Sequence, residues 1–164
     1  MCKKKRGEKQ MTIYFDMDGT IANLYGVDGW IDKLNAEDVS PYLRASPMLN
    51  MTVFARMLHT LQAEGIKVGI ISWTSKSGSK AYNRKVELAK LKWLTTHLRS
   101  VQFDEIHILD FDTPKWSVAD EQAVLFDDNK SVRIDFANHN RLALDVGNII
   151  NDLKTIITMK GTMI

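Results

Sequence analysis

Hydrophobic residues along the chain gather into short continuous runs that are separated by longer segments of mixed character. Each run is rich in Ile, Val, Leu, Tyr or Phe, as buried β-strands are. The runs predict strands at residues 12–16, 67–72, 105–111, 123–126 and 141–146. The run at 67–72, Lys-Val-Gly-Ile-Ile-Ser, has the near-continuous apolar character of a strand inside a parallel sheet.

Segments with helical periodicity lie between several of these strands. One begins at Met51, repeats apolar residues at i, i+3, i+4 and i+7, and ends before Gly65, which suits the glycine position after a helix. Further helices are expected at 81–98 and 148–157, and shorter ones near 30–34 and 117–122. In the helix at 81–98, the inward side is marked by Val86, Ala89, Trp93 and Leu94. Strands that alternate with helices predict an α/β fold, a Rossmann-like, doubly wound parallel sheet.

The segment at 21–47 lacks a sustained period and contains two glycines and two prolines. Because Gly and Pro interrupt regular elements, we expect a small insertion here that lies over the end of the first strand, with a turn at 35–41. A length of 164 residues suits one domain. We therefore expect a single domain over 11–164, preceded by a flexible basic tail at 1–10.

Composition narrows the class of protein. A hydrophobic fraction of 45% and a net charge of +2 suit a globular protein without an overall acidic or basic bias. The one cysteine, Cys2, excludes an intramolecular disulfide and a cysteine-based zinc site. No apolar run approaches the roughly 20 residues that span a bilayer, and the basic start is not followed by the apolar stretch of a signal peptide. We expect a soluble, cytoplasmic protein with no membrane partner.

Polar residues stand where the predicted strands end. Asp16 and Asp18 follow the first strand, with Gly19 providing a sharp exit from it, and Ser72 ends the second. Lys115 follows the third strand, and Asp127 and Asp128 follow the fourth. The carboxyl ends of parallel strands meet at one edge of a sheet, so these groups should converge on one cleft.

This set of groups suits the chemistry of a phosphoryl group. Clustered carboxylates bind Mg²⁺ through oxygen, and a lysine with a metal can neutralise phosphate oxygens. One aspartate can act as a nucleophile, and a second can pass a proton to the leaving oxygen. The residues therefore predict a Mg²⁺-dependent enzyme that acts on phosphate esters.

The motif Asp16-Met17-Asp18-Gly19-Thr20 resembles the first motif of the haloacid dehalogenase (HAD) superfamily. Ser72, Lys115 and Asp127-Asp128 resemble the second, third and fourth motifs in the same order. The resemblance implies that Asp16 is the nucleophile and a metal ligand, and that Asp18 is the general acid/base whose backbone carbonyl also binds the metal. It further implies that Lys115 offsets charge between the nucleophile and the phosphate.

The resemblance leaves two assignments open. It implies that Asp128 binds the metal directly and that Asp127 supports it, although the order within this pair stays open. Ser72 is preferred as the hydroxyl of the second motif because it ends the apolar run, with Thr74 as the alternative. The expected substrate-binding positions are Gly19, Thr20, Ser72, Trp73 and Thr74.

The substrate is expected to be a phosphorylated small molecule, and a nucleotide above others. Tyr25, Trp30, Trp73 and Trp116 lie beside motif positions and could stack on a nucleobase. The small insertion and the motifs most resemble nucleotidases of the 5′(3′)-deoxyribonucleotidase type. Two alternatives are a phosphatase on polynucleotide ends, which the basic tail would assist through a weak contact with nucleic acid, and a non-enzymatic binding module on the same fold.

Overall fold

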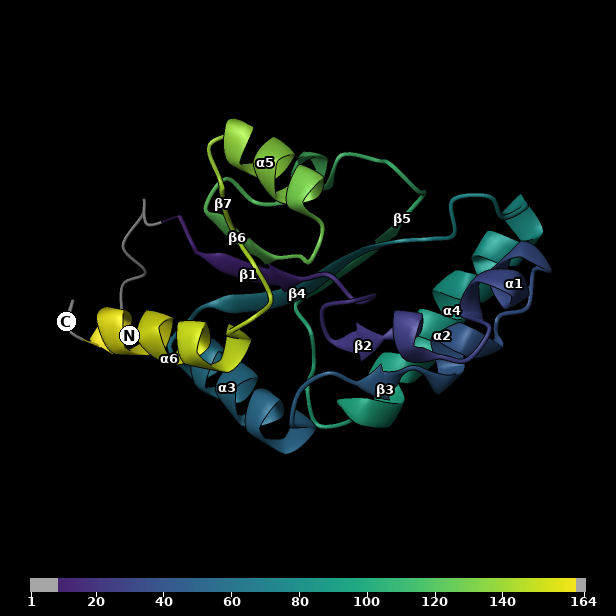
Figure 1. Cartoon of the computed structure of the whole chain (residues 1–164). Helices are drawn as coiled ribbons and strands as arrows, with labels where there is room; N and C mark the ends of the chain where they lie inside the picture. Colours follow the sequence, from purple (N-terminus) through teal and green to yellow (C-terminus); the bar gives the residue numbers. More distant parts are fainter. Residues whose placement is uncertain (1–8, 162–164) are drawn as a thin grey trace.

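A five-stranded parallel sheet forms the centre of the computed structural model, which describes residues 9–161 (Figure 1). The strand order is β5-β4-β1-β6-β7. The strands are β1 (Thr12–Phe15), β4 (Lys67–Trp73), β5 (Glu105–Leu109), β6 (Ala123–Phe126) and β7 (Leu142–Leu144). Because β1 is flanked by β4 on one side and β6 on the other, the order reverses at β1, as expected for a doubly wound sheet. The predicted fold class is confirmed.

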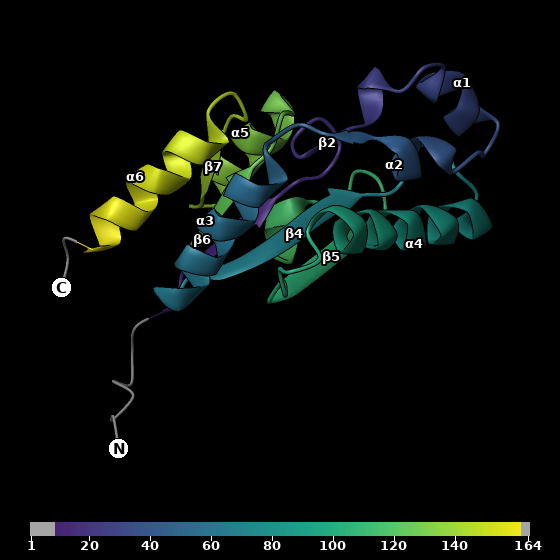
Figure 2. The same cartoon turned by 90° about the horizontal axis from the view of Figure 1, so that it is seen from below.

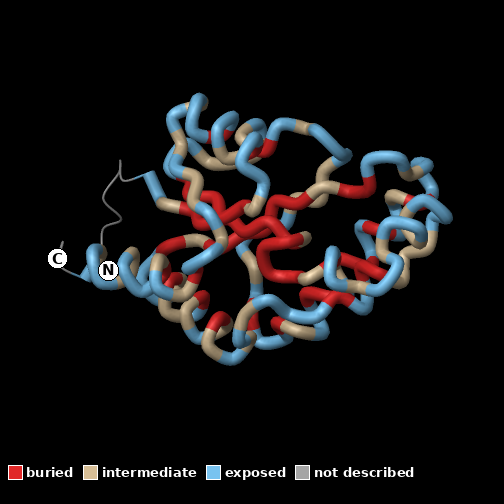
Figure 3. Tube along the Cα trace, viewed as in Figure 1, coloured by how far each residue is buried: buried red, intermediate tan, exposed pale blue. Residues whose placement is uncertain are grey.

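Alternate residues of the strands pack into two apolar layers, one on each face of the sheet. In β1, Ile13 and Phe15 pack with the helices of one face, whereas Tyr14 packs into the layer on the opposite face. The first face carries α3 (Met51–Ala63), α6 (Ile149–Gly161) and the C-terminal half of α4 (Lys80–His97). The opposite face carries α5 (Lys130–Asn138), which lies across the sheet from α3 and α6 in Figure 1. Both faces of the central strand are therefore covered, and the buried residues concentrate along it (Figure 3).

The small insertion expected after the first strand is present, and it is more regular than its composition suggests. It consists of β2 (Ala22–Asn23), the 3₁₀ turn η1 (Leu24–Gly26), α1 (Trp30–Asn35), α2 (Ser40–Arg44) and β3 (Ser46–Pro47). β2 and β3 pair antiparallel and close the base of the insertion. Its inner side packs on the N-terminal half of α4, where Leu24 and Tyr42 meet Tyr82 and Val86. Figure 2 shows α1 and α2 lying over α4, beyond the end of the sheet.

Two local expectations differ from the structure. Helix α5 was not expected, because it is short and only Val132 and Phe136 bury their side chains on it. The short helix expected at 117–122 is instead the 3₁₀ turn η2 (Lys115–Ser117), so no α-helix separates β5 from β6.

The predicted basic tail at 1–10 falls largely outside the described residues. Of its residues the structure describes Lys9, which pairs with Glu121, and Gln10, whose side chain donates to the carbonyl of Gly65 at 2.7 Å. Within residues 9–161, no helix has the length and apolar character needed to cross a membrane.

Candidate active site

The loop after β1 places two aspartates at the carboxyl edge of the sheet. Asp16 is held directly at the strand end, where its backbone N–H donates to the carbonyl of Phe126 at 2.9 Å. The chain then turns sharply at Gly19, whose φ is +76°. A Cβ at Gly19 would lie 2.3 Å from Oδ2 of Asp128. Glycine is therefore required both by the backbone conformation and by the close approach of the fourth-motif carboxylate.

Three carboxylates converge beside this loop. One oxygen each from Asp16, Asp127 and Asp128 lies within 4.8 Å of the others. Burial and the neighbouring Asp16 raise the pKa of Asp127 and of Asp128 to about 6, although Lys115 partly opposes both shifts. A divalent cation would relieve this crowding of negative charge, and carboxylate oxygens are the ligand type that Mg²⁺ prefers. The residues therefore fit a magnesium site.

Lys115 lies beneath the carboxylate cluster and is almost sealed from solvent. Its Nζ donates to Asp16 Oδ1 at 2.9 Å and to Asp127 Oδ2 at 2.6 Å. Burial alone would lower the pKa of Lys115, but the two carboxylates outweigh burial and hold it above its ordinary value. The ammonium is therefore positively charged and bridges the candidate nucleophile to the fourth motif.

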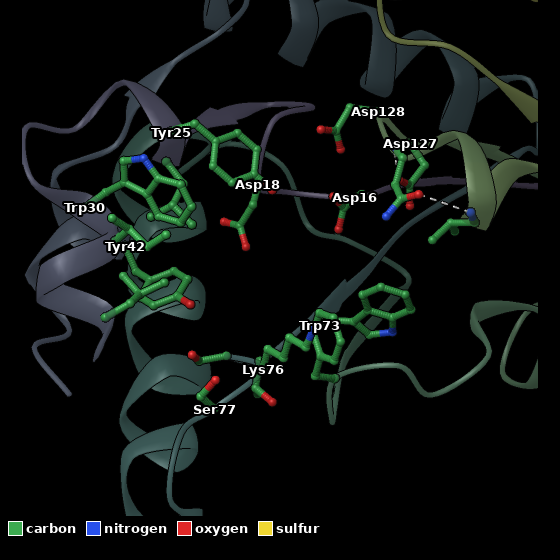
Figure 4. Close-up of a pocket in the computed structure, with 18 of the residues that line it drawn as sticks. Asp16, Asp18, Tyr25, Trp30, Tyr42, Trp73, Lys76, Ser77, Asp127 and Asp128 are labelled. Atoms are coloured by element: carbon green, nitrogen blue, oxygen red, sulfur yellow. Dashed lines mark hydrogen bonds between the residues drawn. The ribbon is translucent and has the colours of Figure 1, made fainter. Parts of the chain in front are cut away.

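Asp18 lies between the carboxylate cluster and the aromatic residues of the insertion, and it lines the same cavity as both (Figure 4). Its Oδ2 accepts a hydrogen bond from Lys90 Nζ at 2.6 Å. Burial raises the pKa of Asp18, Lys90 opposes the shift and Asp16 adds to it, so the pKa lies above its ordinary value. A carboxyl with a raised pKa can hold the proton that a general acid has to donate.

The two candidate hydroxyls of the second motif lie in different surroundings. Ser72 is fully buried, its Oγ accepts from Lys90 Nζ at 2.8 Å, and it does not line the cavity described next. Thr74 does line that cavity, and its buried Oγ1 has no hydrogen-bond partner among the described residues. Of the two hydroxyl residues, the structure thus places only Thr74 at the cavity. Gly19 and Thr20 do not line the cavity either.

A cavity of about 530 Å³ opens above these groups, between the sheet edge and the insertion. Asp16, Asp18, Lys115, Asp127 and Asp128 line one end. The insertion contributes Tyr25, Trp30 and Tyr42, and the core contributes Trp73 and Phe111 (Figure 4). Ser75, Lys76 and Ser77 follow Thr74 along the rim.

One of the expected aromatic residues lies elsewhere. Trp116 does not line the cavity and stacks on His139, with ring centroids 3.8 Å apart. Lys90, Tyr42 and Phe111 are among the groups at the site that were not expected there. Lys90 could have been found, because it falls on the inward face of α4 beside Ala89 and Trp93, where a charged residue is unusual.

Solved structures share this arrangement of elements. A protein of unassigned function from Corynebacterium glutamicum matches with a TM-score of 0.51 and 15% identity, covering 92% of this chain and 94% of the other. The D,D-heptose 1,7-bisphosphate phosphatase of Burkholderia thailandensis matches with a TM-score of 0.51 and 14% identity, covering 81% and 75%. The fold is HAD-like. At these identities the likeness concerns the HAD-like fold alone, and neither a family model nor a curated protein matches the sequence.

Proposed function

We propose that this protein is a Mg²⁺-dependent phosphomonoesterase that forms an aspartyl-phosphate at Asp16. The observation that carries the proposal is the bridge from Lys115 to both Asp16 and Asp127, next to the cluster completed by Asp128. A structural ion pair would need one carboxylate, whereas a third carboxylate at an open cavity adds repulsion that a bound cation would relieve. Function at this edge also suits an open α/β sheet.

Each residue then has a defined part in the reaction. An oxygen of Asp16 attacks phosphorus, the ester P–O bond breaks, and the leaving oxygen takes the proton of Asp18. Asp18 next takes a proton from water as that water attacks phosphorus, which breaks the bond to Asp16 and releases phosphate. Lys115 offsets the negative charge near Asp16 throughout. Bound Mg²⁺ would neutralise phosphate oxygens.

The ligand contacts can be divided among the remaining residues. Both carboxylate oxygens of Asp127 already accept hydrogen bonds, from Lys115 Nζ and from the backbone N–H of Asn129. Asp128 is therefore the better candidate for direct contact with the metal. Thr74 is the candidate for the hydroxyl that holds a phosphate oxygen, because its unpartnered Oγ1 would gain a hydrogen bond there.

A nucleotide is the proposed substrate. The cavity has aromatic residues on two sides, with Tyr25 against Trp30 and Trp73 against Phe111, each pair at 5.0 Å between ring centroids. Flat apolar walls suit a heterocyclic base better than a sugar covered in hydroxyl groups, which needs many hydrogen-bonding partners. The volume of about 530 Å³ is within the range of small-molecule sites.

A substrate screen tests both the proposed chemistry and the proposed substrate. Purified protein with Mg²⁺ is assayed for phosphate release from nucleoside monophosphates, sugar phosphates, p-nitrophenyl phosphate and oligonucleotides with terminal phosphates. We expect turnover that is highest on nucleoside monophosphates and that Asp16→Asn removes, with a loss of at least about 10³-fold. No turnover by the wild type, or an Asp16→Asn variant as active as the wild type, contradicts the proposed chemistry. Preference for a sugar phosphate contradicts only the proposed substrate.

The proposed stacking of a base on Trp30 can be tested separately from the chemistry. Trp30→Ala should raise KM for the preferred nucleotide about 10-fold, because one stacked base is worth about 1 to 3 kcal/mol. KM for a sugar phosphate, which has no aromatic ring to stack on Trp30, should change little in the same variant. An equal change for both esters would assign Trp30 to packing of the insertion instead.

A further inference from the structure

Lys90 is a lysine on α4 whose side chain is sealed from solvent, with 1% of it exposed. Its Nζ donates to Asp18 Oδ2 at 2.6 Å and to Ser72 Oγ at 2.8 Å. The same nitrogen lies 5.3 Å from the ring centroid of Tyr42. An ammonium has three protons, and two hydrogen bonds and one aromatic face accommodate all of them.

The three contacts of Lys90 come from three parts of the molecule. Asp18 belongs to the loop after β1, Ser72 to the buried strand β4, and Tyr42 to helix α2 of the insertion. Burying a charge is costly even when it is paired, and apolar side chains at such positions often give equal or greater stability. Core packing therefore gives no reason for a lysine here, whereas its contact with Asp18 does.

Lys90 occupies only one oxygen of the Asp18 carboxyl. Oδ2 accepts from Lys90, and among the described residues no donor is bonded to Oδ1. Asp18 also lines the cavity. A carboxyl fixed through one oxygen cannot rotate freely, so the other oxygen keeps a constant direction.

We propose that Lys90 is a positioning residue, which anchors Oδ2 of Asp18 so that Oδ1 is the oxygen that exchanges a proton with the leaving group. This inference rests on the proposed phosphomonoesterase function. Lys90 itself takes no part in the bonds that form or break. Without the anchor the carboxyl samples several rotamers, and protonation of the leaving oxygen loses its geometry.

The test uses two esters that differ in their need for a proton. Lys90→Met keeps most of the length of the side chain and removes its charge. A nucleoside monophosphate has an alkoxide as its leaving group, which departs slowly unless it receives a proton. For this ester we expect kcat/KM to fall about 10- to 100-fold. For p-nitrophenyl phosphate, whose leaving group departs without a proton, the fall should be no more than about 3-fold. The ratio kcat/KM reports only the steps up to transfer of the phosphoryl group to Asp16.

A double-mutant cycle shows whether Lys90 acts through Asp18. In an Asp18→Asn background, Lys90→Met should cause no further loss on the nucleotide, because the group that Lys90 positions is already disabled. The matched control is Lys92→Met, which removes an exposed lysine from the same helix and should leave both esters unaffected. Equal losses on the two esters, or a full additional loss in the Asp18→Asn background, would overturn the inference and leave Lys90 a structural residue.

A milder variant keeps the inference testable where Lys90→Met does not fold. Ser72→Ala deletes one hydroxyl and so releases one of the two hydrogen bonds of Lys90. We expect the same selective loss on the nucleotide at about 3- to 10-fold; an unselective loss or none overturns the inference. A wild-type protein without turnover on any ester is a different result, which overturns the proposed function itself and this inference with it.

Discussion

Lys115 holds together two carboxylates that would otherwise repel each other in a buried place. Replacing it in Lys115→Met leaves Asp16 and Asp127 without their buried partner, and removal of one partner from a buried ion pair costs about 3 to 5 kcal/mol. We expect the free energy of unfolding in urea to fall by that amount and Mg²⁺ to restore part of it. Lys154→Met, which removes an exposed lysine on α6, is the control and should unfold like the wild type. A Lys115→Met protein of unchanged stability would show that the two carboxylates are not charged together.

A variant that replaces the hydroxyl of Thr74 with a methyl group tests whether Thr74 holds the phosphate. Thr74→Val keeps the shape of the side chain and removes a buried hydroxyl that has no partner among the described residues. Stability should therefore stay the same or rise, because no protein hydrogen bond is lost. The affinity for inorganic phosphate, measured by calorimetry with Mg²⁺, should fall about 10-fold, the equivalent of one hydrogen bond to a charged group. An unchanged phosphate affinity would show that the Thr74 hydroxyl does not hold the phosphate.

At the scale of single residues, the sequence predicted most of those that meet at the site, because they follow strand ends. Asp16, Lys115, Asp127 and Asp128 do meet at one edge of the sheet. Lys90 was not predicted, since it comes from a helix interior and its contacts with Asp18 and Ser72 depend on how α4 docks. A site residue that comes from a helix cannot be found by looking for polar residues at the ends of predicted strands.

The turn that follows β1 depends on Gly19 for two separate reasons, and a second glycine allows them to be measured apart. Gly65, after α3, has a φ of +75° but nothing within 4 Å of a would-be Cβ. Gly65→Ala should cost about 1 kcal/mol, the strain of a left-handed residue alone. Gly19→Ala should cost more and should also weaken Mg²⁺ binding, since its Cβ displaces the Asp128 carboxylate. Thermal unfolding with and without Mg²⁺ measures both effects, and equal costs for the two variants would contradict this account.

Elements were predictable where several residues pack inward and less so where few do. Helix α3 buries Phe54, Leu58 and Leu61, and its period is plain in the sequence. Helix α5 buries only Val132 and Phe136, so its period is too short to recognise. The start of α5 is signalled in the sequence by the N-cap residue Asn129, whose side chain accepts from the N–H groups of two residues in the first turn.

The stability of the whole molecule should depend on pH, and so should the part of that stability that Mg²⁺ adds. Folding raises the pKa of Asp127 and of Asp128 from 3.8 to about 6. Between these values the folded state holds more protons than the unfolded state, so without metal the free energy of unfolding falls as pH rises through this window. Mg²⁺ binds the ionised carboxylates, so its stabilising effect should be small near about pH 5 and large near about pH 8, reaching about 2.7 kcal/mol at 100 times its Kd.

Calorimetric unfolding at the two pH values, with Mg²⁺ and with K⁺ salt of equal ionic strength, checks this expectation. The K⁺ arm controls for screening of surface charge. A Mg²⁺ effect of the same size at both pH values would mean that the metal binds away from the carboxylate cluster.

The indole of Trp73 makes the candidate site visible to fluorescence without an added label. Its N–H donates to the carbonyl of Thr113 at 2.8 Å, and Lys115 Nζ lies 5.0 Å from the ring centroid. The electric field at an indole sets its emission wavelength, and an arriving phosphate would add negative charge close to the ring. Titrating the protein with inorganic phosphate while recording tryptophan emission should therefore yield a binding curve, and Trp73→Phe should abolish it. Ligand affinity can then be measured for variants that no longer turn over any substrate.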